Sequence, residues 1–334
     1  MPLFRTHWQL LAGVLALIAS LGCHRANFHQ TLKENLRPTQ GGPVVLAQYQ
    51  PWFGDRDHID VGYSSHDRVV LARQIEQAQN LGISAFVVDW YGKRKPFLDA
   101  AFFLLQQTAA EKNFKVALMY DEPEDSPDYT AAAISALDYA YDQYIGPQAP
   151  HRNAYLTYNG RPVIFLWPRG KHTDWKQVRE RVQGWQANPI LIMEDGAMRH
   201  ADVLDGFYAW VQPGERGWTP DGSNWGREYL ESFYKKMKEN YPNKIAVGAA
   251  WPGFNDHKAS WSLNRYMDSR CGKTFEESLR VFRRFYTNSD PLPFLLVVTW
   301  NDYEEGTAIE RGVGSCRESG TSHAATAGGG STSK

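Results

Sequence analysis

The sequence contains little cysteine and no excess of either charge. Three cysteines occur in 334 residues, and only Cys271 and Cys316 lie beyond the N-terminal segment. Two cysteines are too few for a disulfide framework and lack metal-ligand spacing, so the fold must depend on its hydrophobic core. The 36 Lys and Arg residues nearly balance the 37 Asp and Glu residues, and they are scattered along the chain. This distribution provides no basic stripe for phosphates, so we expect no nucleic-acid partner.

Two kinds of cofactor site are also missing. No glycine-rich dinucleotide fingerprint follows the first apolar run after the N-terminus, residues 43–49. A metal-dependent hydrolase would need several histidines together at strand ends. The histidines instead occupy expected loops and helices, at His58, His66, His151, His172, His200 and His257. We therefore expect neither a cofactor nor a metal ion.

The one long apolar stretch lies at the N-terminus. A positive residue precedes an apolar run over residues 10–21, and small residues lead to Cys23. This pattern predicts a secretory signal peptide over residues 1–22, which is short for a membrane span. The SLGC sequence also resembles the lipobox of bacterial lipoproteins, which implies a lipidated Cys23 as the only link to a membrane. Ser20 stands where Leu is usual, so simple cleavage stays the alternative. In both cases we expect export to the periplasm, the cell surface or the medium.

The rest of the chain alternates short apolar runs with segments of helical spacing. The eight apolar runs are residues 43–49, 83–90, 114–120, 161–167, 189–194, 205–211, 244–251 and 293–300. The helical segments are residues 67–82, 96–113, 129–145, 174–187, 224–241 and 274–288. Continuous apolar strands alternating with helices are typical of a parallel sheet covered by helices. The repeat predicts a (β/α)8 TIM barrel over residues 43–311, with a doubly wound open sheet as the alternative.

Two segments depart from this repeat. The fifth connection, residues 195–204, has room for a short helix only. After Glu310 the chain becomes rich in Gly, Ser and Thr, and we expect residues 312–334 to be a disordered tail without an eighth helix. That helix is either missing or replaced by residues 26–39, which lie largely in the linker expected over residues 23–42.

Aromatic and acidic residues gather where the expected strands end. Active sites of such barrels lie at the C-terminal ends of the strands. The candidate substrate-binding residues there are Tyr49, Trp52, Asp89, Trp90, Tyr91, Tyr120, Glu122, Trp167, Glu194, Trp210, Trp251, Trp300 and Asn301. Six of the 12 tryptophans are among them. Any one of these could simply plug the barrel mouth, but flat aromatic faces beside carboxylates suit a sugar better than a cationic ligand.

The last strand is followed by an acidic cluster in the sequence TWNDYEEGTAIE. If the chain turns helically there, Asp302 and Glu305 stand at i and i+3 with Cβ atoms about 5–6 Å apart. Glycoside hydrolysis uses two carboxyl groups of this kind, and their repulsion raises one pKa enough to supply a general acid. Glu304 and Glu310 would be solvated or structural charges. The alternative is that the acids only begin a surface helix.

These motifs resemble glycoside hydrolase family 99, the endo-α-mannosidases and endo-α-mannanases. WNDYEEGTAIE is similar to that family's WNEWHEGTQIEP, and also to the WNDYGES motif of the family 71 α-1,3-glucanases. Residues 62–92 and 49–54 resemble the family 99 segments around the first two strands. The resemblance implies that Glu305 is the general acid/base and that Asp302 deprotonates the substrate's 2-hydroxyl. It also implies a sugar contact for Glu122 and a subsite wall at Trp90 or Tyr91.

The chain departs from family 99 at two positions. Asp302 replaces a Glu and withdraws the carboxylate by one methylene, and a displacement near 1 Å can cost about 100-fold in rate. Glu304 replaces a His. We therefore expect an endo-acting, retaining hydrolase of α-linked mannan or glucan. The alternative is a glycan-binding surface lipoprotein with a degenerate site. The sequence gives no signal for the sugar, the linkage or the oligomeric state.

Overall fold

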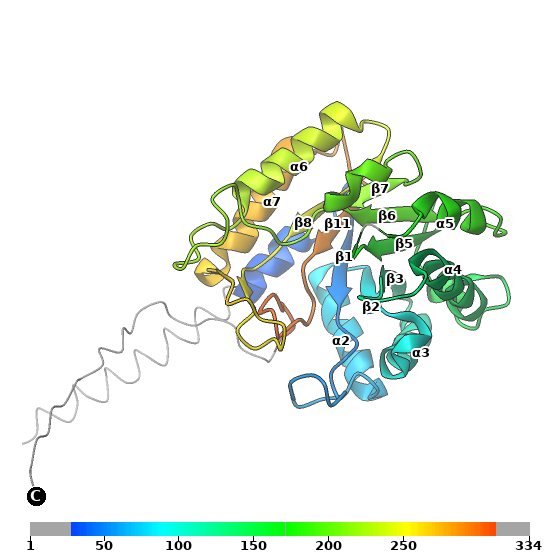
Figure 1. Ribbon diagram of the computed structural model, residues 1–334. Coiled ribbons are helices and arrows are strands. Elements are labelled where there is room, and N and C mark those ends of the chain that lie inside the picture. Colours follow the sequence, from blue (N-terminus) through cyan, green and yellow to red (C-terminus); the bar gives the residue numbers. More distant parts are fainter. Residues whose placement is uncertain (1–27, 171, 312–334) are drawn as a thin grey trace, which may run out of the picture.

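The computed structural model describes residues 28–170 and 172–311 (Figure 1). The expected signal peptide over residues 1–22, the lipidation site Cys23 and the tail over residues 312–334 lie outside the described residues. Within the described ranges, no helix is both long enough and apolar enough to cross a membrane.

Eight parallel strands close into a barrel. They are β1 (Val44–Tyr49), β2 (Ala85–Trp90), β3 (Lys115–Asp121), β5 (Arg161–Trp167), β6 (Ile190–Glu194), β7 (Gly206–Tyr208), β8 (Ile245–Ala250) and β11 (Phe294–Val297). Each strand pairs with the next, β3 pairs with β5, and β1 pairs with β11 with Val44 opposite Phe294. The short strand β4 (Thr157–Tyr158) adds to β5 in antiparallel fashion. The predicted barrel is confirmed, and the open sheet is excluded.

Helices cover the barrel in the predicted alternation. They are α2 (Arg68–Leu81), α3 (Pro96–Glu111), α4 (Tyr129–Ala140), α5 (Trp175–Val182), α6 (Arg227–Asn240) and α7 (Lys273–Phe285). Asp67 accepts a hydrogen bond from the N–H of Val69 and begins α2, while Gly82 ends it in the left-handed conformation that glycine adopts without strain. The connection after β6 is the 3₁₀ segment Asp195–His200, as short as the sequence predicts.

A helix from the N-terminal side lies where the eighth helix of the barrel would be. Residues 28–36 are helical, and Leu32 and Leu36 are buried in the main core. On one side the ring of Phe28 packs against Phe275 of α7 (6.2 Å). On the other side Gly82, at the end of α2, closely approaches the carbonyl of Leu36. Residues 28–36 therefore occupy the position of the eighth helix, within the segment for which the sequence also suggested a linker.

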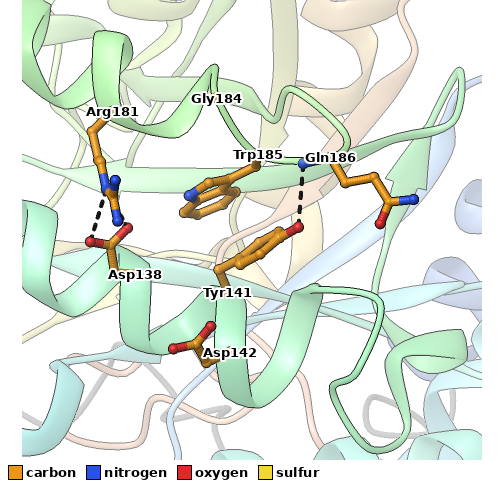
Figure 2. A pocket seen from close by; sticks show the side chains of 7 residues that line it. All are labelled: Asp138, Tyr141, Asp142, Arg181, Gly184, Trp185 and Gln186. Carbon is orange, nitrogen blue, oxygen red and sulfur yellow. Dashed lines mark hydrogen bonds and ion pairs between the residues drawn. The ribbon is translucent and has the colours of Figure 1, made fainter.

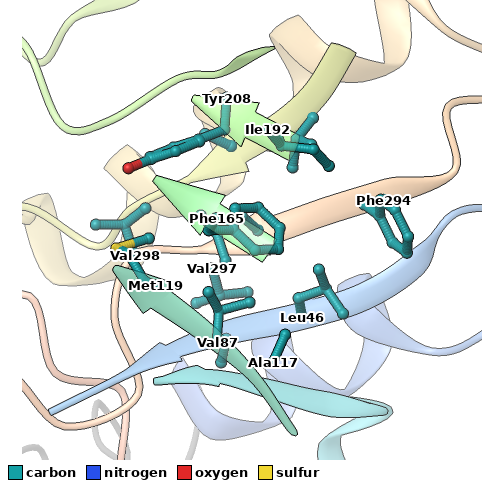
Figure 3. Close-up of a cluster of buried hydrophobic side chains, with 14 of the residues drawn as sticks. Leu46, Val87, Ala117, Met119, Phe165, Ile192, Tyr208, Phe294, Val297 and Val298 are labelled. Atoms are coloured by element: carbon teal, nitrogen blue, oxygen red, sulfur yellow. The ribbon is translucent and has the colours of Figure 1, made fainter. Parts of the chain in front are cut away.

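The interior of the barrel is filled by apolar side chains from alternate strand positions. Leu46, Val87, Met119, Phe165 and Ile192 meet there (Figure 3). Because side chains alternate between the two faces of a strand, the residues two positions further on also face inward. The strand order and this alternation together decide which side chains reach the barrel mouth.

Candidate active site

Four of the predicted substrate-binding residues gather at the barrel mouth. They are Asp89, Trp167, Glu194 and Trp210, each two positions beyond the interior residues Val87, Phe165, Ile192 and Tyr208 (Figure 3). The rings of Trp167 and Trp210 meet edge to face at 5.0 Å. The mouth thus combines carboxylates with aromatic side chains, as the sequence predicts.

Three other predicted residues have the opposite orientation. The hydroxyl of Tyr49 donates to Gln74 of α2 (2.8 Å), and the indole N–H of Trp90 donates to Asp99 of α3 (2.9 Å). Tyr120 precedes the inward Asp121 and packs against Trp90, and burial raises its pKa to about 12. All three side chains are buried between strands and helices. They therefore stabilise the barrel from outside and do not line its mouth.

The residues at the ends of β8 and β11 are also part of the scaffold. Trp251 is fully buried, and its indole N–H donates to the carbonyl of Trp225 (3.0 Å). Trp300 is fully buried as well. The side-chain amide of Asn301 bonds both backbone groups of Gln50, accepting from the N–H (2.7 Å) and donating to the carbonyl (2.9 Å). Asn301 therefore joins the end of β11 to the end of β1.

The acidic cluster after β11 forms a single turn and no helix. One oxygen of Asp302, Oδ1, accepts hydrogen bonds from the backbone N–H groups of Glu304 (3.0 Å) and Glu305 (2.8 Å). Its other oxygen, Oδ2, accepts from the side-chain amide of Gln50 (3.0 Å). The chain then reverses, and the N–H of Glu310 donates to the carbonyl of Trp300 (2.8 Å). Asp302 thus holds the turn that presents Glu305.

The pair Asp302 and Glu305 has the electrostatics of an acid and base pair. Burial raises the pKa of both carboxyl groups, and the proximity of Glu305 raises that of Asp302 further. The hydrogen bonds from Gln50 and from the N–H of Glu305 oppose this effect at Asp302. Asp302 is 1% exposed, whereas the side chain of Glu305 is 17% exposed. The raised pKa values favour the protonated forms of both carboxyl groups.

Glu304 and Glu310 are both structural. Glu304 is buried and pairs with Nδ1 of His58 (2.8 Å), whose ring stacks on Trp52 with the centroids 4.4 Å apart. Glu310 is buried and accepts from the hydroxyls of Tyr63 (3.0 Å) and Tyr303 (2.5 Å). Neither carboxylate is a solvated surface charge.

A second acidic group occupies the mouth at β2 and β3. Asp121 forms a two-pronged ion pair with Arg169, with both N–O distances 2.6 Å. Asp89 accepts from the hydroxyl of Tyr91 (3.0 Å). Burial raises the pKa of Asp89 well above its ordinary value, and Asp121 raises it further. The predicted residues Asp89 and Tyr91 therefore contact each other, beside the ion pair between Asp121 and Arg169.

The remaining predicted carboxylates differ in accessibility. Glu122 is buried and accepts from the N–H of Arg169 (2.9 Å) and from the hydroxyl of Thr173, so its oxygens fix the loop after β5. Glu194 is partly exposed beside Asp195. Burial and the charge of Asp195 raise its pKa to about 8. The raised pKa favours the protonated form of Glu194, and its Oε2 accepts a hydrogen bond from the N–H of Gly196 (3.0 Å).

Several side chains at this site carry no strong sequence signal. Gln50 follows β1 at a position whose side chain faces into the barrel, as the alternation of side chains along the strand predicts. Arg169, Trp261 and Arg265 come from loops, where no periodicity marks them. Trp261 and Arg265 approach Glu305 itself, with the indole nitrogen 3.1 Å and a guanidinium nitrogen 3.7 Å from Oε1.

A separate surface pocket lies outside the barrel, between α4 and α5. Its cavity volume is about 300 Å³, and the stacked rings of Tyr141 and Trp185 form part of its lining (Figure 2). It contains none of the predicted site residues.

No group of residues in the described part of the chain has the composition and proximity of a metal site.

Comparison with solved structures supports the fold. The GH99 endo-alpha-mannosidase from Bacteroides thetaiotaomicron, in complex with BIS-TRIS-propane, matches with a TM-score of 0.64 at 17% identity, covering 82% of this chain and 88% of that chain. A second structure of the same enzyme gives 0.62 at 15% identity with the same coverage. A glycoside hydrolase-like protein gives 0.58 at 15% identity, again covering 82% and 88%. At these identities the likeness shows a common barrel.

Sequence comparison identifies the family. No curated protein matches the chain. The family model described as glycosyl hydrolase family 71 matches residues 61–325, which include the strand ends from β2 onward and the turn with Asp302 and Glu305. Family 71 is one of the two families whose motifs the sequence resembles. The chain belongs to glycosyl hydrolase family 71 and is a glycosidase.

Proposed function

We propose that the protein cleaves an α-linked glycan, a glucan or a mannan, by endo-action with retention of configuration. The observation that supports this most is the pair Asp302 and Glu305, joined by one turn at the end of β11 and both with raised pKa. The acidic and aromatic barrel mouth suits the hydroxyls and apolar faces of sugar rings.

Glu305 is the general acid in this proposal. It is the more exposed carboxyl group of the pair, and burial raises its pKa, which favours the protonated form that a general acid needs. It would donate that proton to the glycosidic oxygen as the bond to C1 breaks. Proton transfer of this kind contributes about 100- to 10,000-fold to the rate.

Asp302 is the base. Its oxygens accept three hydrogen bonds, which fix the carboxylate in one orientation. In a retaining reaction it would take the proton of the substrate's 2-hydroxyl, which then attacks C1. Family 71 motifs carry Asp at this position, so the short side chain that departs from family 99 agrees with family 71. If Asp302 instead activates water, the product will have the inverted configuration.

The comparisons support both a glucan and a mannan as the substrate. Membership of family 71 supports an α-glucan, and WNDYEEG resembles a motif of α-1,3-glucanases. The fold matches structures described as endo-alpha-mannosidases, which supports α-mannan and endo-action. Both substrates belong in the first test.

The test is a digestion screen of the chain from Ala26 onward against α-glucans and α-mannans. Released reducing ends measure activity, and NMR of the first product identifies its anomer. Glu305→Gln and Asp302→Asn should each lose about 100-fold or more. Glu239→Gln, an exposed change on α6, is the matched control and should retain full activity. Saturable binding without release by wild type would support the alternative of a glycan-binding lipoprotein.

We also propose that the protein is exported, from the signal-like residues 1–22 and the lipobox-like SLGC sequence. Fractionation of cells that express the full chain tests export, and labelling with a radioactive fatty acid tests lipidation. A Cys23→Ser variant should lose the label. Soluble, unlabelled protein outside the cytoplasm would indicate simple cleavage.

A further inference from the structure

A hairpin between β8 and α7 covers the turn that holds Glu305. Strands β9 (Phe254–Asn255) and β10 (Tyr266–Met267) pair in antiparallel fashion, and residues 256–265 form the loop between them. The N–H of Asn255 donates to the carbonyl of Glu305 (2.7 Å). Gly306 has φ +66°, and a Cβ there would lie 3.2 Å from the carbonyl oxygen of Asn255. The hairpin therefore rests directly on the turn.

One buried carboxylate organises the loop. Asp256 is fully buried and accepts from the N–H groups of Leu263 (3.1 Å) and Arg265 (2.8 Å) and from the hydroxyl of Ser262 (3.1 Å). The Nε–H of Arg265 also donates to Asp256 (2.7 Å). Burial alone would raise the pKa of Asp256, but these hydrogen bonds lower it below its ordinary value. Asp256 thus remains ionised and fixes the positions of the loop residues.

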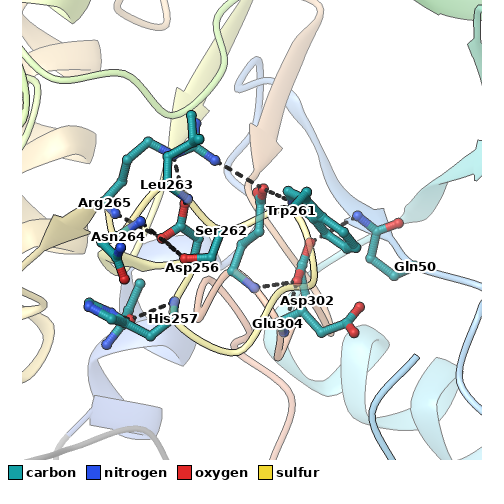
Figure 4. A network of polar contacts seen from close by, with 12 residues as sticks. Gln50, Asp256, His257, Trp261, Ser262, Leu263, Asn264, Arg265, Asp302 and Glu304 are labelled. Atoms are coloured by element: carbon teal, nitrogen blue, oxygen red, sulfur yellow. Dashed lines mark hydrogen bonds and ion pairs between the residues drawn. The ribbon is translucent and has the colours of Figure 1, made fainter. Parts of the chain in front are cut away.

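The loop directs two donors at the same oxygen of Glu305. The indole N–H of Trp261 donates to Oε1 (3.1 Å), and Nη2 of Arg265 lies 3.7 Å from it (Figure 4). The guanidinium of Arg265 also stacks over Phe254 (4.9 Å). Among the residues that the structure describes, no hydrogen bond reaches Oε2. Oε1 is therefore anchored, and Oε2 is the oxygen that can carry the catalytic proton.

Trp261 differs in exposure from the tryptophans at the strand ends. It is 40% exposed, whereas Trp52 and Trp210 are 5% and 9% exposed. One contact of its ring is with the ring of Trp52, in an edge arrangement at 5.8 Å. Leu263, on the same loop, is 72% exposed. Trp261 thus offers an open aromatic surface immediately beside Glu305.

We propose that loop 256–265 forms the subsite for the leaving-group sugar, with Trp261 as its stacking surface and as the donor that orients Glu305. This inference rests on the proposed function of Glu305. The general acid protonates the oxygen that leaves with that sugar, so the leaving sugar must lie against the acid. Asp302, Asp89 and Asp121 are more deeply buried. In this proposal they would hold the sugar under attack.

The loop then has a defined part in the proton transfer. Oε2–H of Glu305 gives its proton to the glycosidic oxygen while the bond between that oxygen and C1 breaks, and the bonding electron pair stays on the oxygen. Glu305 becomes a carboxylate. The N–H of Trp261 and the charge of Arg265 at Oε1 stabilise this charged form. Trp261 is therefore both a binding and a positioning residue.

Binding measurements test the stacking surface. Glu305→Gln protein would be titrated calorimetrically with α-linked gluco- and manno-oligosaccharides, with and without Trp261→Ala. Loss of the ring should weaken binding about tenfold, while Trp261→Phe should weaken it less than about threefold because an aromatic face remains. Glu239→Gln, an exposed change on α6 outside this loop, is the control and should bind normally. Equal affinity of Trp261→Ala and the control would overturn the subsite.

A titration of Glu305 tests the positioning role. In otherwise wild-type protein, Trp261→Phe removes an N–H that favours the ionised form, so the pKa of Glu305 should rise. The ¹³C resonance of the Glu305 carboxyl reports this directly, and the alkaline limb of the pH–rate profile should move upward with it. An unchanged titration in folded Trp261→Phe protein would remove the positioning role.

These measurements separate the two proposals. Oligosaccharide binding that depends on Trp261, in a wild-type protein that releases no sugar, would support the subsite and contradict the hydrolase mechanism. Hydrolysis that is indifferent to Trp261→Ala would support the mechanism and contradict the subsite.

Discussion

Replacing Arg169 with glutamine should destabilise the protein by leaving a charge unpaired at the barrel mouth. Asp121 is 4% exposed as a side chain and receives both of its short ion-pair contacts from this one guanidinium. Asp89 is also buried, and the charge of the neighbouring Asp121 raises its pKa. Without Arg169, neither buried acid would have an ion-pair partner among the described residues, although the charge of Arg94 would still lower the pKa of Asp121.

The size of the loss follows from the burial of the two partners. Breaking a buried ion pair by removing one partner costs about 3–5 kcal/mol. The side chain of Arg169 is 34% exposed, so water already shares its solvation and the lower end of that range applies, about 3 kcal/mol at neutral pH. Arg169→Gln with Asp121→Asn removes the unpaired charge of Asp121 and should be more stable than Arg169→Gln alone.

Urea unfolding at several pH values measures this loss. The pKa of Asp121 is already raised by burial, with Arg169 opposing the rise, and it should be higher in Arg169→Gln. An acid with a raised folded pKa loses stability as the pH rises through that value. The deficit of the variant should therefore be small near pH 5 and larger near pH 8. A deficit that is the same at both pH values, or a double variant no more stable than the single, would refute the reasoning.

Three further predictions concern other parts of the chain. Leu32→Ala should cost about 2–5 kcal/mol in urea unfolding if residues 28–36 complete the outer layer, whereas the exposed Lys33→Ala should cost almost nothing. Glu194 has a pKa of about 8 against an ordinary 4.5, so wild type should lose stability as pH rises through this window. Glu194→Gln should not show this loss of stability with pH. The same pH dependence in both proteins would show that Glu194 does not cause it. Gly306→Ala should cost about 1–2 kcal/mol in thermal unfolding from its positive φ, and more if the approach of Asn255 cannot relax; unchanged stability would show that the hairpin adjusts freely.

The barrel could be predicted because its signal is repeated. Each strand is a continuous apolar run, and each helix has a buried face, so an error in one element does not change the architecture. The short connection after β6 could also be predicted, because residues 195–204 leave no room for a full helix. The place of residues 28–36 could be suggested only, since it depends on contacts with α2 and α7 that are far away in sequence.

The site could be predicted in part. The apolar runs locate the strand ends. The predicted site residues there include side chains that face into the barrel and side chains that face away from it. The side-chain alternation separates the inward Asp89 from the outward Tyr49, Trp90 and Tyr120. Trp261 could not be predicted, because its position depends on how a loop folds around the buried Asp256.

The pairing of β1 with β11 has a consequence for synthesis of the protein on the ribosome. One edge of β1 pairs with β2, which soon follows it, but the other edge pairs with β11, the last strand in the described part of the chain. Until Phe294 and its neighbours emerge, the nascent barrel is an open sheet with unpaired backbone groups along Val44–Tyr49. Such edges pair readily with other chains. The growing chain should therefore need protection by chaperones until β11 has been synthesised.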